Sequence, residues 1–443
     1  MSRKRISEIA LSSVVALLIY GAFFYIYKNS ISPTNSYQGL CFKELTFGVH
    51  AIAIGFYLLP LLWLPIKPTR PSDITIWLLY MFSYAPTTFV CFHVMKDPFP
   101  DAILLLVALL IGLIIVDLAR RHPIKLGFHL DTPIVMPLDK IIIILSVLLC
   151  IYIFSLIKFH FNLDFETVYE RRLEVRYSSS LLSGYIIAFI RSVVIIFSVY
   201  MAFVKKSKIA FIALIILSVG IFSYDGTKTS LFVPVFLVLI YFLIIYKKSN
   251  IMLNIAFLSL FFVSIIEFIS LDSNIISTLF TRRIFALPGY INTLFWEYYS
   301  VHDKVMMADS IGRFFVDSSN VTAAPFVIGY EYFNNAETNA NTGIWMGSYA
   351  HFGFIGIVLL SMVAGFILGL FDNLTKTKFP VLGYLVCAYI GILWSEQMLH
   401  TSMLTGGIFY ILVLLIIYCN SNILNCKINY FQNARLALKK SNY

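Results

Sequence analysis

Stretches of about 20 consecutive apolar residues, separated by short polar segments, recur along the whole chain, and each is long enough to cross a bilayer as a helix. Hydrophobic residues make up 59% of the 443 residues and charged residues only 13%, about half the charged share of a soluble domain. The sequence therefore predicts an all-α polytopic membrane protein with about twelve transmembrane helices. The predicted spans are 9–27, 44–66, 73–95, 101–118, 139–161, 180–203, 208–224, 229–247, 251–270, 348–371, 380–398 and 403–420.

The distribution of basic residues between the loops sets the predicted orientation. Of the 33 Lys and Arg residues, 20 fall at the two ends of the chain and in the even-numbered short loops. Short basic loops stay in the cytoplasm. We therefore expect both termini in the cytoplasm and a long segment, 271–347, on the outer side. That segment is rich in aromatic residues, so we expect short interfacial helices in it rather than disorder. A single membrane domain, 1–443, is the simplest organisation.

Several cations fall in segments that this topology places on the outer side, against the usual rule. They are Arg171, Arg172 and Arg176 in one segment, Lys228 in the Asp225–Ser230 turn, and Arg282, Arg283 and Arg313 in the long segment. Guanidinium groups bind phosphate through two parallel hydrogen bonds. The pattern therefore indicates a site for an anionic ligand at the outer face. Two alternatives remain open: the first arginines form a solvated helix with i,i+4 contacts, and the turn is an ordinary one.

Arg191 lies inside the predicted span 180–203. A charge at that depth is expensive and marks a candidate functional site. The alternatives are that its side chain reaches the membrane surface, or that it forms a buried pair with Glu267 or Asp225.

Aromatic and polar residues of the outer segments are candidates for sugar contacts. Tyr290, Glu297, Asn341 and Trp345 offer ring faces for sugar C–H groups and polar atoms for hydroxyls; an interfacial aromatic belt is the alternative for the rings. His302, His351 and His400 all fall at the predicted outer face. His351 is the candidate base that deprotonates an acceptor hydroxyl, and Glu297, Asp317 and Glu396 are rival bases.

The motifs of several other functional classes are missing from the sequence. It has no His-Glu-x-x-His pattern or comparable ligand spacing, so we predict no metal. It has no Walker-type glycine loop for a nucleotide, and no basic stretch interleaved with aromatics of the kind that binds single-stranded nucleic acid. We therefore expect no cofactor and no nucleic-acid partner.

Three short motifs resemble those of O-antigen polymerases, the Wzy-type polymerases of oligosaccharide repeat units. They are Asp-Gly-Thr-Lys-Thr-Ser-Leu-Phe from Asp225, Arg-Arg-x-x-x-x-Pro-Gly-Tyr from Arg282, and Asn-Thr-Gly-x-Trp-x-Gly from Asn341, which precedes His351. The number of spans and the arginine-bearing outer loop extend the resemblance over the whole architecture.

The resemblance implies a glycosyltransferase-C-like helical bundle in a bacterial inner membrane, with its active site facing the periplasm. The enzyme would transfer a growing glycan from undecaprenyl diphosphate to the terminal sugar hydroxyl of a new lipid-linked repeat unit, without a metal. A chain-length regulator and a flippase would be its partners. The residues that fit the motifs of the family, and that the resemblance implies as diphosphate ligands, are Arg171, Arg172, Arg176, Lys228, Arg282 and Arg283. His351 also follows one of these motifs.

Three rival interpretations remain. An O-antigen ligase would share the architecture and the arginines. A flippase for lipid-linked oligosaccharide would need polar groups along its path, whereas the predicted spans are nearly uncharged apart from Lys158, Arg191 and Glu267. A purely structural membrane protein would leave the outer cations unexplained.

Overall fold

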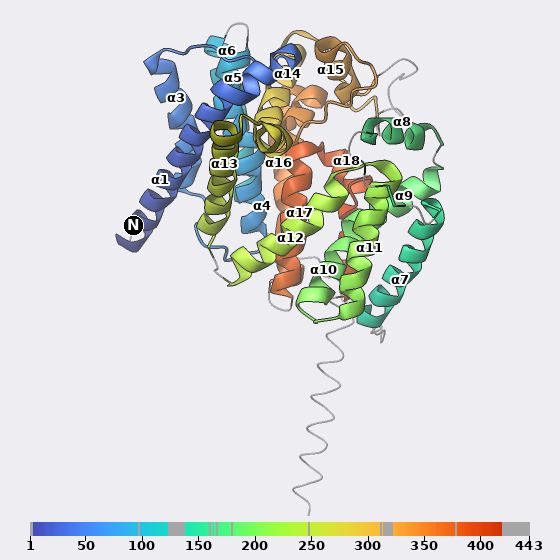
Figure 1. The fold of residues 1–443 in the computed structure, drawn as a ribbon. Coiled ribbons are helices and arrows are strands. Elements are labelled where there is room, and N and C mark those ends of the chain that lie inside the picture. The colour runs from blue at the N-terminus through green and yellow to red at the C-terminus, as the bar shows by residue number, and fades with distance from the viewer. Residues whose placement is uncertain are drawn as a thin grey trace, which may run out of the picture. The chain divides into compact units, whose positions relative to one another are not determined.

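A computed structural model gives the fold of this chain (Figure 1). The structure describes residues 3–95, 98–122, 138–158, 161–162, 164, 167–178, 180–246, 249–310, 312, 322–376 and 379–418. These residues form helices and no strand, which confirms the predicted all-α class for this part of the chain. Arg313, Asp317 and the segment 420–443 lie outside the described residues, as does the side chain of Arg176.

Eight helices among the described residues are long and apolar enough to cross a membrane, and each coincides with a predicted span. They are Arg5–Gln38, Ser72–Val94, Phe99–Ala119, Asp139–Leu156, Leu182–Phe203, Lys208–Asp225, Ile251–Leu271 and Ile344–Thr375. Four shorter apolar helices lie at the remaining predicted spans: Phe47–Leu62, Thr229–Leu243, Pro380–Glu396 and Ile408–Tyr418. The chain is therefore a multi-pass membrane protein.

Contacts divide the chain into two compact units, and each unit is built from segments that are distant in sequence. Unit 1 comprises Met1–Pro123, Phe242–Gly369 and Ile390–Ser402. The elements that begin in it are α1 (Arg3–Ile26), η1 (Tyr27–Ile31), α2 (Ser32–Asn35), η2 (Ser36–Gln38), α3 (Phe47–Leu58), η3 (Leu59–Leu62), α4 (Ser72–Leu79), η4 (Tyr80–Tyr84), α5 (Ala85–Val94), α6 (Pro98–Ala119), α13 (Ile251–Leu271), η7 (Ser277–Ala286), α14 (Leu287–Val301), α15 (Ala324–Phe333), α16 (Ile344–Thr375) and α18 (Leu399–Leu404).

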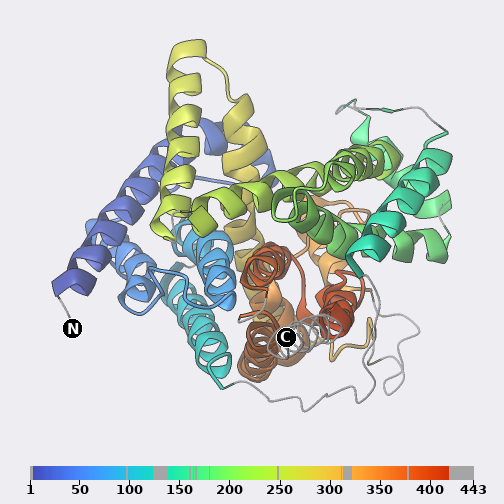
Figure 2. The ribbon, with the colours of Figure 1, turned by 90° about the horizontal axis from the view of Figure 1, so that it is seen from below.

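Unit 2 comprises Ile124–Tyr241, Leu370–Tyr389 and Met403–Tyr443. The elements that begin in it are α7 (Leu138–Leu156), α8 (Val168–Ser178), α9 (Leu181–Phe189), η5 (Ile190–Val194), α10 (Ile195–Phe203), α11 (Lys208–Asp225), α12 (Thr229–Ile240), η6 (Tyr241–Tyr246), α17 (Pro380–Glu396) and the helix Ile408–Tyr418. Within this unit α11 packs against both α10 and α7 (Figure 2).

The core of unit 1 forms where α1 packs on α13 and α14 packs on α5 (Figure 1). The helix α14 belongs to the segment 271–347, for which the sequence predicted interfacial helices. The expected short helices are present, but most of α14 is buried. Its Asn292 amide donates to the Thr87 hydroxyl at 3.0 Å and accepts from the Thr342 hydroxyl at 2.8 Å. Because these bonds satisfy its polar group, α14 can lie inside the unit rather than on its surface.

A glycine sets the distance between α14 and α5. A Cβ added at Gly289 would lie 2.7 Å from the backbone carbonyl of Pro86, whereas one added at Gly55 in α3 would meet nothing within 4 Å. Small residues permit such close helix packing in membrane proteins.

Gly289→Ala is expected to destabilise the protein by roughly 1–3 kcal/mol, since the added methyl group overpacks two helix backbones. Gly55→Ala, the matched control, is expected to be neutral or slightly stabilising because alanine favours the helix. The measurement is the temperature at which half of the detergent-solubilised protein loses its monodisperse chromatographic peak. Equal temperatures for the two variants would contradict the close packing of α14 on α5.

Candidate functional site

The predicted cations of unit 2 gather around the turn between α11 and α12. Gly226 ends α11 with a positive φ of 64°, and a Cβ there would lie 3.0 Å from the Val168 carbonyl oxygen of α8. Glycine is therefore the residue that suits both the backbone conformation and the close approach. This turn and the basic residues Arg171, Arg172, Arg191 and Lys228 are called the turn cluster below.

Arg191 lies in the π-helical segment η5, a helix type that often marks functional positions. Its guanidinium pairs with the Asp225 carboxylate, and it also donates to the Thr227 hydroxyl at 3.0 Å and the Ser230 hydroxyl at 3.2 Å. The Arg191 side chain keeps 29% of its surface exposed. Of the two pairs expected as alternatives, the structure contains the one with Asp225. Glu267 instead accepts bonds from the backbone N–H groups of residues 275 and 276.

The helix α8 packs beside the end of α11 (Figure 1), and Arg171 and Arg172 connect the two. Arg171 donates to the carbonyl oxygens of Asn162 at 2.9 Å and Ser223 at 3.1 Å, and Arg172 donates to that of Gly226 at 3.1 Å. These bonds to backbone carbonyl oxygens orient the two guanidinium groups at the end of α11. With Arg191 and Lys228, four cations stand around one turn that contributes a single carboxylate, Asp225. Guanidinium groups that are oriented in this way can bind a phosphate through two parallel hydrogen bonds.

Arg282 and Arg283 lie in the π-helical segment η7 of unit 1. Arg282 donates to the side-chain oxygens of Asn35 at 3.0 Å and Gln38 at 2.8 Å. The Arg283 side chain is exposed and makes no hydrogen bond with the described residues; Glu396 lies within its electrostatic range. The two neighbours therefore differ, since Arg282 holds neighbouring segments together and the Arg283 guanidinium remains available to a ligand.

His351 lies just before a break in α16, where Gly353 takes a positive φ of 62°. The imidazole is completely buried, and its Nδ1 accepts the Met307 backbone N–H at 3.2 Å. In a neutral ring the hydrogen then resides on Nε2. His351 would therefore need the other tautomer to remove a proton from a hydroxyl through Nε2, and in this arrangement it anchors the segment around Met307. Its role as a base stays a prediction.

Asp309 and His400 accompany His351. Asp309 Oδ1 lies 4.0 Å from His351 Nδ1, and it is buried without a hydrogen-bond partner among the described residues. Burial lowers the pKa of His400, which favours its neutral form. The three side chains form the one group in the described part of the chain that could hold a metal ion, with ligand atoms within 4.8 Å of one another. Coordination through Nδ1 of His351 would break its bond with Met307.

The predicted sugar-contacting residues separate into buried and accessible ones. Tyr290 and Trp345 are 5% and 1% exposed and lie in the core of unit 1, which favours a packing role for both rings. Glu297 is half-buried and Asn341 is exposed, so these two can be reached by a ligand.

The structure thus groups the predicted residues by unit. It gathers Arg171, Arg172, Arg191 and Lys228 in unit 2, and it places Arg282, Arg283 and His351 in unit 1. Sequence reasoning missed Asn35, Gln38 and Asp309, because neutral amides near a span end and a single aspartate in a long loop carry no motif.

Comparison of the chain with protein-family models, with curated protein sequences and with solved structures finds no match.

Proposed function

We propose that this protein polymerises lipid-linked oligosaccharide repeat units in a bacterial cytoplasmic membrane. In this proposal it transfers the growing glycan from undecaprenyl diphosphate to the terminal sugar hydroxyl of a new lipid-linked unit. About twelve helices cross the bilayer, both termini are cytoplasmic, and the turn cluster and the segment 271–347 face the periplasm. A flippase supplies the substrate and a chain-length regulator limits the product.

The turn cluster is the observation that carries the proposal. The guanidinium groups of Arg171 and Arg172 are fixed by carbonyl oxygens, and Arg191 is fixed by Asp225, Thr227 and Ser230. Positively charged groups that are already ordered bind a diphosphate without a further loss of side-chain entropy. Their position at the end of the apolar helices α11 and α12 suits a ligand whose diphosphate head is attached to a membrane-embedded chain.

The chemistry needs such cations. Breaking the bond between the sugar and the diphosphate builds negative charge on the leaving group. Preorganised cations stabilise that charge more strongly in the transition state than in the ground state, which is what accelerates a reaction. A group of arginines can in this way take the part that a divalent ion plays in other glycosyl transfers.

A second group of cations fits the need for a second substrate. A polymerase binds two lipid diphosphates, one on the donor and one on the acceptor. The chain carries the turn cluster in unit 2 and the Arg282–Arg283 pair in unit 1, and we assign one diphosphate to each group. An O-antigen ligase, which accepts only one polyprenyl diphosphate, leaves one group without an assigned ligand.

The alternatives remain an O-antigen ligase and a flippase for lipid-linked oligosaccharide. A flippase needs polar groups along the whole translocation path. The clustering of the candidate cations at the ends of apolar helices favours chemistry at one face over passage through the protein.

The gel ladder of lipopolysaccharide from a strain that lacks the gene tests the proposal. We expect the ladder to be lost while the lipid core carrying a single repeat unit remains, and the wild-type copy should restore the ladder. Long polymer that accumulates on the lipid carrier would identify a ligase. Loss of all repeat units from the core without periplasmic polymer would identify a flippase, and an unchanged ladder would refute all three.

A further inference from the structure

A second basic site lies in unit 1, apart from every residue assigned above. It is a cavity of about 580 Å³, within the usual size range of small-molecule sites. Its charged lining residues are Arg5, Glu8, Lys67, Arg70, Asp73, Arg120 and Arg121. These basic residues belong to the chain end and the loops that are predicted to be cytoplasmic. They were used above only to set the predicted orientation.

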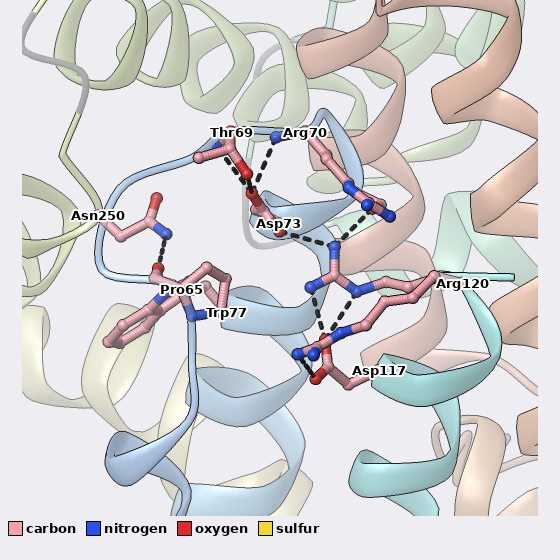
Figure 3. Close-up of polar contacts among 10 residues, drawn as sticks. Pro65, Thr69, Arg70, Asp73, Trp77, Asp117, Arg120 and Asn250 are labelled. Atoms are coloured by element: carbon pink, nitrogen blue, oxygen red, sulfur yellow. Dashed lines mark hydrogen bonds and ion pairs between the residues drawn. The ribbon is translucent and has the colours of Figure 1, made fainter. Parts of the chain in front are cut away.

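The loop that carries Lys67 and Arg70 is held in place on both sides (Figure 3). At its start, the Pro65 carbonyl accepts the Asn250 amide at 2.6 Å and also the Trp77 indole N–H. At its end, one Asp73 carboxylate oxygen accepts the backbone N–H of Thr69 at 2.6 Å and that of Arg70 at 2.8 Å. The cations of this loop are therefore presented on an ordered backbone.

A buried ion network forms the wall beside this loop (Figure 3). Arg120 donates to Asp73 at 2.7 Å and to Asp117 at 2.5 Å, and Arg121 pairs with Asp117 as well. The Arg120 side chain is only 3% exposed. The Arg120 guanidinium therefore donates its hydrogen bonds to protein groups. It holds the wall of the cavity together and is not the group that contacts a ligand.

The remaining charges leave the cavity positive. Lys67 pairs with Glu8, another lining residue, at 2.8 Å, and the Lys67 side chain is 53% exposed. Arg70 makes no side-chain hydrogen bond with the described residues. The five basic lining residues face three carboxylates, those of Glu8, Asp73 and Asp117, so the formal charge favours an anion. Trp63, another lining residue, also has a buried indole N–H that lacks an acceptor among the described residues.

We infer that this cavity binds a phosphate group, and that its source is the headgroup of an anionic phospholipid in the cytoplasmic leaflet. The cavity lies where apolar helices end: α6 ends at Ala119, and α4 and α13 begin at Ser72 and Ile251. Leu62, next to the lining residue Trp63, is 58% exposed and offers an apolar surface to an acyl chain. Basic cavities between membrane helices at the cytoplasmic side bind anionic headgroups. The inference uses the orientation predicted from the basic loops, and it does not depend on the proposed polymerase activity.

Native mass spectrometry of the full-length protein in detergent tests the inference. Phosphatidylglycerol, phosphatidylcholine and inorganic phosphate are added separately as probes. We expect a stoichiometric phosphatidylglycerol adduct, and on the order of tenfold weaker binding in the Lys67→Gln/Arg70→Gln variant, since each cation near a lipid headgroup contributes to affinity. Both substitutions affect exposed or half-buried side chains, so the variant should fold, and its monodisperse peak verifies this.

Lys206→Gln/Lys208→Gln is the matched control, because it removes two exposed positive charges at and just before the start of α11, outside the cavity. Its phosphatidylglycerol binding should equal that of the wild type. Equal binding of phosphatidylglycerol and phosphatidylcholine, or equal loss in both double variants, would overturn the site. Binding of inorganic phosphate that Lys67→Gln/Arg70→Gln abolishes, without a phosphatidylglycerol adduct, would keep the phosphate site and overturn the lipid as its source.

Discussion

Replacing Arg283 with alanine is expected to eliminate long polymer while leaving the amount of protein in the membrane unchanged. The side chain is exposed and makes no hydrogen bond with the described residues, so its removal should have little effect on stability. Loss of one preorganised donor to developing negative charge lowers a catalytic rate by about 10²–10³. Arg283→Lys should retain part of the activity, because lysine keeps the charge but not the planar pair of donors. The measurement is the glycan ladder of cells that carry each variant, with the membrane protein quantified in parallel.

Two comparisons make this result interpretable. Lys206→Ala removes an exposed cation from a turn without an assigned role, and it should leave the ladder intact. Arg282→Ala should also reduce polymer, but it breaks the bonds to Asn35 and Gln38 and should lower the protein level too. Long polymer in the Arg283→Ala strain, at normal protein level, would remove Arg283 from the proposed site.

Arg120→Met is expected to cause the largest loss of stability. Removing one member of a buried ion network leaves the other charges uncompensated, at a cost of about 3–5 kcal/mol. Asp73 keeps its two backbone N–H donors and Asp117 keeps Arg121 (Figure 3), so we expect a loss near the lower end, about 3 kcal/mol. The measurement is thermal unfolding of the detergent-solubilised protein, followed by loss of its monodisperse peak.

Arg121→Ala is the control for this prediction. It removes an arginine from the same Asp117 carboxylate, but the Arg121 side chain is 47% exposed instead of buried. An exposed pair contributes up to about 1 kcal/mol. Adding Asp73→Asn and Asp117→Asn to Arg120→Met should recover part of the loss, since the buried charges are then gone. Equal unfolding temperatures for Arg120→Met and Arg121→Ala would contradict the buried network.

The membrane helices were accessible to sequence reasoning because composition and length determine them directly. Each of the eight long apolar helices lies at a predicted span. The position of Arg191 inside a predicted span also led to a prediction of an ion pair, and the structure contains one with Asp225. The sequence did not decide between Asp225 and Glu267 as the partner. Choosing between them needs the packing of α10, α11 and α12, which no local pattern encodes.

Other features depend on contacts between distant segments. From the sequence, Arg120 and Arg121 belong to a basic loop that is predicted to be cytoplasmic. In the structure Arg120 is buried and donates to Asp73, which lies 47 residues away. His351 was a candidate catalytic base because of its residue type. Only the fold shows that its Nδ1 accepts a hydrogen bond from the backbone N–H of Met307. The π-helical segments that carry Arg191, Arg282 and Arg283 likewise depend on packing, since helix periodicity in a sequence does not distinguish π from α turns.

Reconstitution of the reaction tests the polymerase assignment most directly. Lipid-linked single repeat units, extracted from the strain that lacks the gene, are incorporated into liposomes with the purified protein. We expect a ladder of longer lipid-linked glycans that grows with time and is missing with Arg283→Ala. Repeat units that keep their single length in liposomes containing folded wild-type protein would contradict the polymerase assignment.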